Sequence, residues 1–408
     1  MLKTIAVLIG MALVSLLPLP AVGGEDAAEG GPEVRNGIDV LAAEDFAALA
    51  GARVGLITNH TGVDRRGRST IRLLHDARNV TLVAVFSPEH GLEGKLDVEH
   101  IADSEDRRTG VRVLSLYGET RTPTPEMLRG IDTLVFDIQD IGTRFYTYIS
   151  TMGNAMQAAA ANDIRFVVLD RPNPIGGVAT AGPVLDDDKR SFVGHHTIAV
   201  RHGMTVAELA RMFQAELVPA LELGIVPLGN WRRAMLFDET GLEWVNPSPN
   251  MRSLDAALLY PGIGLLETTN LSVGRGTATP FELLGAPWLD GERLAARIEA
   301  LRIPGIRVRA VRFTPESSKF AGEQCSGIRF EIGDRRAFQP LALGFAIARE
   351  LRLAYAETWD IDPYLRLLGN GDTFAAIERG DPRVSIQSAY AEGLAEFRAR
   401  RESFLLYR

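Results

Sequence analysis

The sequence predicts an α/β protein in which a parallel sheet, covered by helices on both faces, is followed by a smaller α/β or α+β domain. Short, continuously apolar segments alternate with helical segments through the first half, which is typical of parallel strands buried on both faces. The chain has 408 residues, too many for one ordinary core, and therefore favours two domains. We assign residues 37–245 to the first domain and residues 246–408 to the second.

Four apolar segments of the first domain are predicted to be strands, with helices between them. Ser69 and Thr124 are predicted N-caps, an alanine-rich helix is expected over residues 148–162, and Thr205 begins a capping-box sequence. The predicted strands are residues 54–57, 80–86, 133–138 and 164–169.

The second domain is predicted to begin after the Pro- and Asn-rich segment 246–250, which is the candidate domain junction. Amphipathic periods and β-branched runs predict both helices and strands beyond it. The predicted helices are residues 291–301, 341–355 and 385–405, and the predicted strands are residues 306–313 and 328–332.

The N-terminus has the pattern of a secretory signal peptide over residues 1–23. Lys3 precedes an apolar stretch over residues 5–17, and small residues follow it. A permanent anchor is the alternative, but the apolar stretch is short for a spanning helix. Residues 24–36 are rich in Gly, Glu and Ala and are interpreted as a flexible leader. We therefore expect an exported protein, periplasmic or extracellular, with no transmembrane segment after cleavage.

Composition and motifs exclude several classes of function. The net charge of −8 is spread along the chain without a basic tract, so the sequence lacks the pattern of a nucleic-acid-binding protein. The usual dinucleotide, phosphate-loop and zinc-protease motifs are absent, and no cofactor is expected. The single cysteine, Cys325, cannot form an intramolecular disulfide and is interpreted as a buried structural residue.

Polar side chains follow each predicted strand of the first domain. In such sheets ligands bind beyond the carboxyl ends of the strands, so these side chains are candidates for one site. They are Asn59, His60, Glu89, His90, Asp137, Gln139, Asp140, Asp170 and Asn173.

Glu89 is the leading candidate for a general acid. Pro88 fixes the backbone just after a buried strand, and His90 and Gly91 predict a sharp turn. A carboxyl group held rigidly beside an apolar wall suits acid catalysis. Glycoside hydrolysis uses two carboxyl groups, about 5 Å apart for retention or roughly 6.5–9.5 Å apart for inversion, although an N-acetylated sugar can supply its own acetamido oxygen as nucleophile. The sequence leaves these alternatives open.

Three histidines that could line the same edge of the sheet also allow a metal ion as an alternative. His60, His90 and His202 are the candidate ligands. Because a hydrogen-bonded histidine is the commoner case, we predict no metal site.

Several long motifs are spread over residues 36–408. They include G-L-I-T-N-H-T-G at 55–62, F-S-P-E-H-G at 86–91, F-D-I-Q-D at 136–140, L-D-R-P-N-P-I-G-G at 169–177 and E-T-T-N-L-S-V-G-R-G at 267–276. Together these motifs resemble those of the exo-β-N-acetylmuramidase family, long catalogued as a domain of unknown function.

This resemblance implies a Rossmann-like first domain whose active site lies in a cleft completed by the smaller second domain. It also implies an enzyme that releases terminal N-acetylmuramic acid from the non-reducing end of peptidoglycan fragments. Glu89, in the F-S-P-E-H-G motif, would then be the catalytic acid. The second catalytic group would be His90, Asp137 or Asp140, with Glu267 as the reserve candidate.

The lactyl carboxylate of such a substrate requires a cation, for which Arg144, Arg171 and Arg275 are the candidates. Tyr146 and Tyr148 are candidates to stack on a sugar face, with a place in the core as the equal alternative. The remaining predicted substrate-binding residues are Asn59, His60, Gln139, Asn173, His202 and Asn270.

Two other functions stay open at this point: a non-catalytic protein that binds peptidoglycan fragments, and a metal-dependent hydrolase. The sequence also leaves open whether the anomeric centre is retained or inverted, whether a stem peptide is tolerated, and whether the protein is a homodimer.

Overall fold

The computed structural model describes residues 33–96, 98 and 100–408, and residues 33–408 form one compact unit. The predicted signal peptide and most of the predicted leader lie outside the described residues. No helix within the described part of the chain is long and apolar enough to cross a membrane.

Residues 33–36, the last four of the predicted leader, were expected to be flexible. Instead they pack against the fold. Val34 is buried in a small cluster with Leu228 and Trp231, and the backbone of Arg35 pairs with that of Gly229. An apolar side chain and one isolated backbone bridge hold this segment against the first half of the protein, so the leader prediction is corrected there.

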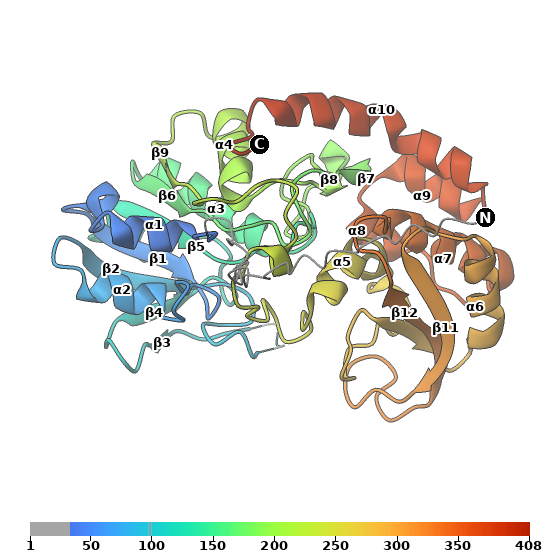
Figure 1. The fold of residues 1–408 in the computed structure, drawn as a ribbon. Coiled ribbons are helices and arrows are strands. Elements are labelled where there is room, and N and C mark those ends of the chain that lie inside the picture. Colours follow the sequence, from blue (N-terminus) through green and yellow to red (C-terminus); the bar gives the residue numbers. More distant parts are fainter. Residues whose placement is uncertain (1–32, 97, 99) are drawn as a thin grey trace, which may run out of the picture. The chain divides into compact units, whose positions relative to one another are not determined.

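A seven-stranded sheet forms the centre of the first half, in the order β3-β4-β2-β1-β5-β6-β9 (Figure 1). All neighbouring pairs are parallel except the antiparallel pair β3–β4 at one edge. The strands are β1 (Arg53–Thr58), β2 (Thr81–Ser87), β3 (Ser104–Glu105), β4 (Arg112–Ser115), β5 (Thr133–Asp137), β6 (Arg165–Leu169) and β9 (Leu223–Val226). This confirms the predicted parallel α/β sheet and its four central strands.

Helices cover both faces of this sheet, which explains why its strands are continuously apolar. Successive side chains of a strand point to opposite faces. Accordingly, Leu56 belongs to one hydrophobic core and Ile57 to the other, as do Val135 and Phe136. The helices are α1 (Gly37–Ala43) and α2 (Thr70–Asp76) on one face and α3 (Tyr148–Ala161) and α4 (Val206–Leu217) on the other.

The order of the strands reverses at β1, which pairs with β2 on one side and β5 on the other. Thr58 is opposite Asp137 at the carboxyl ends of this central pair. Open parallel sheets bind ligands at such a switch point. Glu89 follows the end of β2, so it comes from the strand next to β1.

The second half is built on a smaller, three-stranded antiparallel sheet in the order β10-β12-β11. Its strands are β10 (Leu283–Ala286), β11 (Ile306–Phe313) and β12 (Cys325–Ile332), and its helices are α5 (Leu254–Ile263), α6 (Gly291–Ala300), α7 (Pro340–Ala354), α8 (Tyr364–Leu368), α9 (Gly371–Glu378) and α10 (Arg383–Glu402). The predicted α/β or α+β character of this part is confirmed, and Cys325 is buried as expected.

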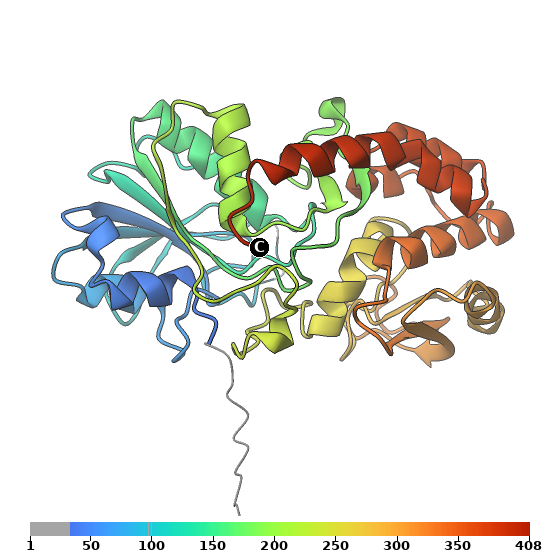
Figure 2. The same cartoon turned by 45° about the horizontal axis from the view of Figure 1, so that its top comes forward.

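The last helix returns toward the first half. α10 packs against β7 (Ala181–Val184), which pairs with β8 (Ala199–Arg201), and the residues after α10 lie beside α4 (Figure 2). There, Arg211 donates a hydrogen bond to the carbonyl oxygen of Phe404. The C-terminal segment therefore ties the two halves together.

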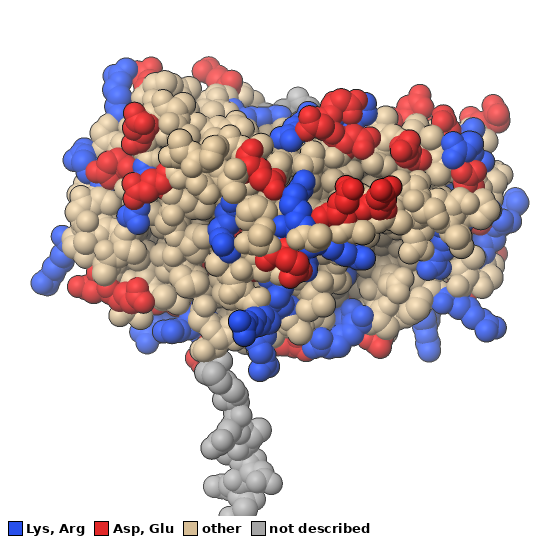
Figure 3. Space-filling model, turned by 90° about the horizontal axis from the view of Figure 1, so that it is seen from above, with Lys and Arg blue, Asp and Glu red and all other residues tan. Residues whose placement is uncertain are grey.

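Two helix-start predictions are confirmed and one is wrong. Ser69 accepts from the amide of Arg72, and Thr205 and Glu208 form a capping box. Residues 125–130 after Thr124 form turns rather than a helix. Acidic and basic side chains are interspersed over the face in Figure 3, as the charge pattern predicts.

Candidate active site

A cavity of about 240 Å³ gathers six of the predicted site residues from both halves of the chain. These residues are Glu89, His90, Tyr146, Tyr148, Glu267 and Arg275. The cavity is smaller than the roughly 300–1,000 Å³ of sites for drug-sized ligands, so it suits a single sugar ring more than a long glycan.

Glu89 lies two residues beyond β2, on a turn that directs its carboxyl group into this cavity. His90 and Gly91 both have positive φ, which turns the chain sharply as predicted. The Nδ1 atom of His90 lies 2.7 Å from the carbonyl oxygen of Leu96, which can only accept, so Nδ1 carries a proton. The hydroxyl of Thr147 donates a hydrogen bond to Oε2 of Glu89.

Aromatic rings form the wall beside Glu89. Tyr146 and Tyr148 meet edge to face with ring centroids 5.1 Å apart, and Tyr260 contacts Tyr146 at 5.9 Å. The hydroxyl of Tyr148 donates to the carbonyl oxygen of Pro247. Burial, and then the charge of Glu89, raises the pKa of Tyr148 far above its ordinary value, so the ring stays neutral.

An ion pair faces this wall from the second half of the chain. Nε of Arg275 lies 2.6 Å from Oε1 of Glu267, and their side chains are 29% and 20% exposed. Glu267 therefore lines the cavity, as the reserve prediction requires. Its partner Arg275 is already neutralised by this carboxylate, which weakens its case as the cation for a substrate.

Arg366 is a second cation in the cavity lining, and the sequence analysis did not select it. It lies on α8 and is exposed. Its guanidinium makes no hydrogen bond or ion pair with any of the residues that the structure describes. A substrate anion can therefore bind it without breaking an existing pair.

Asp137 does not line the cavity, so the geometry gives no support to its predicted catalytic role. Its carboxylate is fully buried and lies 2.6 Å from Nε and 3.0 Å from Nη2 of Arg171. Thr70 donates a further hydrogen bond to it. The bidentate pair joins the ends of β5 and β6, so Arg171 is also occupied and cannot serve as the predicted lactyl-binding residue.

Asp140 and His202 are buried together behind the cavity lining. Oδ2 of Asp140 accepts from the amide of Gly142 at 2.7 Å and lies 3.6 Å from Nε2 of His202. Nδ1 of His202 accepts from the amide of Met204. These contacts hold two loops in place, and neither residue contributes to the cavity lining, contrary to their predicted roles.

Arg144 is a structural residue rather than the predicted substrate ligand. Its guanidinium is fully buried and donates to four carbonyl oxygens, at distances between 2.6 and 3.1 Å. Burial lowers its pKa to about 9. The four acceptors belong to Pro183, Ile198, Leu367 and Leu368.

The remaining predicted contacts, all polar side chains at loop positions, bond to nearby backbone instead of lining the cavity. Short polar side chains commonly satisfy loop backbone in this way. Asn59 accepts a hydrogen bond from the amide of Thr61, and the ring of His60 hydrogen-bonds to the carbonyl oxygen of Asn246. The other three donate to carbonyl oxygens: Gln139 to those of Asp140 and Pro172, Asn173 to that of Met204, and Asn270 to that of Thr358.

The three histidines proposed as alternative metal ligands do not converge. His90 lines the cavity, whereas His60 bonds Asn246 and His202 is buried beside Asp140. Across the described part of the chain, no group of three or more His, Cys, Asp or Glu side chains is placed to hold a metal ion.

Sequence reasoning missed Thr147, Tyr260 and Arg366. Thr147 is the N-cap residue of α3, a position that the predicted start of this helix could have suggested. Tyr260 lies in the apolar helix α5 and Arg366 in the five-residue helix α8, neither of which carried a polar motif.

Comparisons with known proteins agree with this arrangement. Residues 54–255 match the family described as exo-β-N-acetylmuramidase NamZ, N-terminal, and residues 258–407 match its C-terminal counterpart. The chain belongs to the NamZ family of exo-β-N-acetylmuramidases. The two matches meet within α5, whereas the predicted junction at 246–250 stays a prediction.

Characterised and solved relatives of the NamZ family cover nearly the whole chain. The peptidoglycan β-N-acetylmuramidase NamZ of Bacillus subtilis is 42% identical over 380 residues, which are 92% of both chains. Two crystal structures of DUF1343 family proteins from Bacteroides fragilis each cover 92% of this chain and 99% of their own. Their identities are 38% and 29%, and their TM-scores are 0.85 and 0.76.

Proposed function

We propose that this protein is an exo-acting β-N-acetylmuramidase that releases terminal N-acetylmuramic acid from the non-reducing end of peptidoglycan fragments. Membership of the NamZ family supports this reaction. The observation that carries the assignment is the position of Glu89, whose carboxyl group lies in a small cavity walled by tyrosines.

Glu89 acts as the general acid in this proposal. Its proton passes to the glycosidic oxygen as the bond from that oxygen to the anomeric carbon breaks, so the leaving sugar departs with a neutral hydroxyl. Water then supplies the new hydroxyl on the anomeric carbon, either directly or after a nucleophile has first bonded to that carbon. The hydrogen bond from Thr147 fixes the carboxyl group. His90 and Glu267 are the predicted second groups that line the cavity with it, and the acetamido oxygen of the substrate is the third candidate nucleophile.

Arg366 is the proposed ligand of the lactyl carboxylate. Of the four arginines considered, Arg144 and Arg171 are buried in structural contacts and Arg275 is paired with Glu267. Arg366 combines a place in the cavity lining with a guanidinium that no described residue neutralises. A guanidinium and a carboxylate can form two parallel hydrogen bonds, which would distinguish N-acetylmuramic acid from N-acetylglucosamine.

We also propose that the reaction takes place outside the cytoplasm. The signal-peptide pattern of residues 1–23 supports export, and peptidoglycan is an extracytoplasmic substrate. Fractionation of cells that express the full-length chain, followed by N-terminal sequencing of the mature protein, tests this proposal. Intact protein that stays in the cytoplasm would contradict it.

Release of a chromophore from N-acetylmuramic acid glycosides tests the reaction and the assignment of Glu89 together. The wild-type protein should cleave this glycoside, and the Glu89→Gln variant should be about 100- to 10,000-fold slower because the general acid is lost. The same variant should still bind the ligand, which separates catalysis from binding.

The N-acetylglucosamine glycoside is the matched control, since it lacks only the lactyl group. Cleavage of this control in preference to the N-acetylmuramic acid glycoside would contradict the proposed specificity. Full activity of Glu89→Gln would instead show that another residue is the acid.

A further inference from the structure

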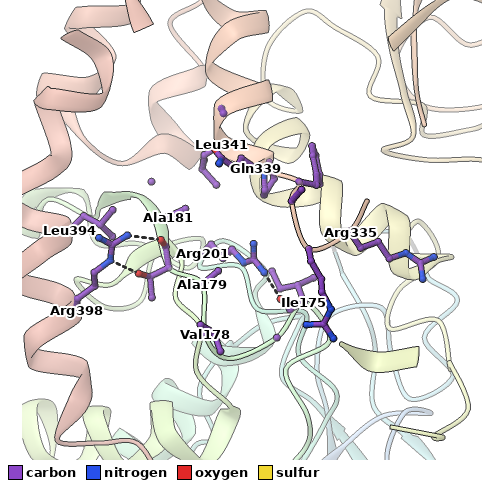
Figure 4. Close-up of a pocket in the computed structure, with 18 of the residues that line it drawn as sticks. Ile175, Val178, Ala179, Ala181, Arg201, Arg335, Gln339, Leu341, Leu394 and Arg398 are labelled. Carbon is purple, nitrogen blue, oxygen red and sulfur yellow. Dashed lines mark hydrogen bonds between the residues drawn. The ribbon is translucent and has the colours of Figure 1, made fainter. Parts of the chain in front are cut away.

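A second and larger cavity, of about 740 Å³, is shown in Figure 4. It shares no lining residue with the cavity that contains Glu89. Loops near β7 and β8 and the helices α7 and α10 supply its lining. Apolar side chains of Leu341, Phe345, Tyr390 and Leu394 form part of its wall. None of its lining residues is an aspartate or glutamate, so it cannot provide the acid for glycoside cleavage.

All the charged residues in this lining are arginines, and there are six of them. Three of these arginines are neutralised locally: Arg233 by Glu208, Arg335 by Asp238 and Asp255, and Arg336 by Glu239. The other three make no ion pair within the described part of the chain. They are Arg201, Arg383 and Arg398.

Arg201 has the strongest need for an anionic partner. Its side chain is only 8% exposed, yet its guanidinium makes one hydrogen bond, to the carbonyl oxygen of Ile175. Its Nε atom has no partner among the described residues. Burial lowers its pKa to about 10. A buried charge without a counter-ion is costly, and a bound anion would relieve that cost.

Two further groups in the lining favour an anion beside Arg201. Gln339, Pro340 and Leu341 place the N-terminus of the 15-residue helix α7 in the cavity, and no side chain caps it. The amides of a first helical turn lack partners inside the helix and attract negative charge. Arg398 reaches in from α10, where it bonds Thr180 through Nε and Nη2 (Figure 4).

We propose that this cavity is a second binding site, for a small organic anion with an apolar body. The carboxylate or phosphate of the ligand lies between Arg201 and the N-terminus of α7, with Arg383 and Arg398 beside it. The apolar body packs against Leu341 and Leu394. The site is separate from the active-site cavity and does not depend on the function proposed above.

Titration calorimetry of the mature protein with benzoate, phenyl phosphate and benzamide tests the proposal. Benzoate and phenyl phosphate carry the two anionic groups that a guanidinium binds in a bidentate manner, whereas benzamide is their uncharged counterpart. Both anions should bind saturably and benzamide should not. Arg201→Gln should weaken anion binding about 10- to 100-fold, because a charge-assisted hydrogen bond is lost from a buried site.

Arg383→Gln provides a second test at an exposed position, where the core is not disturbed. It should weaken binding about threefold to fivefold, since exposed charges contribute less. Arg307→Gln, at an exposed residue of β11 outside this cavity, should bind both anions as the wild type does. Arg366→Gln, in the active-site cavity, should weaken the anions less than Arg201→Gln does.

Three results would overturn the assignment. They are no saturable binding of either anion to the wild type, benzamide binding as tightly as benzoate, and Arg366→Gln weakening the anions as much as Arg201→Gln does. The last result would place the anion in the active-site cavity.

Discussion

The hydroxyl of Thr147 donates a hydrogen bond to the carboxylate of Glu89, although the two residues are 58 positions apart in the chain. Thr147 begins α3 and Glu89 follows β2, so the contact joins the first turn of a helix to the end of a strand. It determines which way the proposed acid points.

Thr147→Val should keep the size of the side chain but remove this donor. We expect the rate of chromophore release to fall about tenfold or more. The carboxylate that forms as Glu89 gives up its proton would lose this donor, and a hydrogen bond to a charged group contributes roughly 1.5–3 kcal/mol. Thr147→Ser keeps the hydroxyl and should retain most of the activity. Equal rates for Thr147→Val and the wild type, measured across the pH–rate profile, would mean that the contact does not position Glu89.

Arg366→Gln should raise KM for the N-acetylmuramic acid glycoside by about 10- to 100-fold, because the lactyl carboxylate loses a charged partner. The N-acetylglucosamine glycoside has no such carboxylate, so its slow cleavage should not change. For Arg366→Lys, the KM for the N-acetylmuramic acid glycoside should lie between those of the wild type and Arg366→Gln. Lysine keeps the charge but cannot form the two parallel hydrogen bonds of a guanidinium. An unchanged ratio of kcat/KM for the two glycosides would remove Arg366 from substrate recognition.

Arg144→Met should destabilise the protein by more than about 4 kcal/mol, since it leaves four buried carbonyl oxygens without a donor. Urea unfolding measures the change. Arg307→Met, at an exposed site on β11, is the matched control and should change stability by less than about 0.5 kcal/mol. A small effect at Arg144 would show that its carbonyl partners find water instead.

Asp170 should make the protein less stable as pH rises from about 4 to 7. Burial raises its pKa from 3.8 to about 7, although the side chains of Thr205 and Tyr407 donate hydrogen bonds to it. The folded state therefore holds a proton that the unfolded state releases, and this stabilisation is complete below pH 4 and lost near pH 7. The slope is about 1.4 kcal/mol per pH unit at most.

Asp170→Asn cannot titrate, so the difference in unfolding free energy between wild type and variant should change across this range. The comparison also cancels other groups, such as His195, whose pKa burial lowers to about 4 and whose effect on stability has the opposite sign. If the unfolding free energies of the wild type and Asp170→Asn change with pH in parallel, Asp170 does not have the raised pKa assigned to it.

The parts of the fold that the sequence predicted are those with local signals. Continuous apolar runs mark β1, β2, β5 and β6 because both faces of the sheet are covered. Side-chain caps at Ser69 and Thr205 act within three residues, and a reader of the sequence can recognise them. Glu89 is similar, since its strand, proline and turn are all consecutive.

The errors at the site come from contacts between distant residues. Asp137 looks like a free carboxylate until Arg171, 34 positions later, is seen to pair with it. Arg144 looks like a substrate ligand until its acceptors, up to 224 positions away, are known. Arg366 is the opposite case: nothing near it in the sequence marks it as a ligand. A cation is available to substrate only when no other residue in the fold neutralises it, and the sequence does not show this.

The contacts of Arg144 bear on whether the two halves of the enzyme move relative to each other during turnover. It binds backbone from the first half of the chain and also the carbonyl oxygens of Leu367 and Leu368, directly after Arg366. Hinge-bending enzymes assemble their sites by swinging two lobes together around the substrate. In this protein such a motion would remove two of the four hydrogen-bond acceptors of the buried Arg144 guanidinium. We therefore expect the pocket to be formed before the sugar binds, with turnover governed by chemistry and sugar dissociation rather than by opening and closing of the lobes.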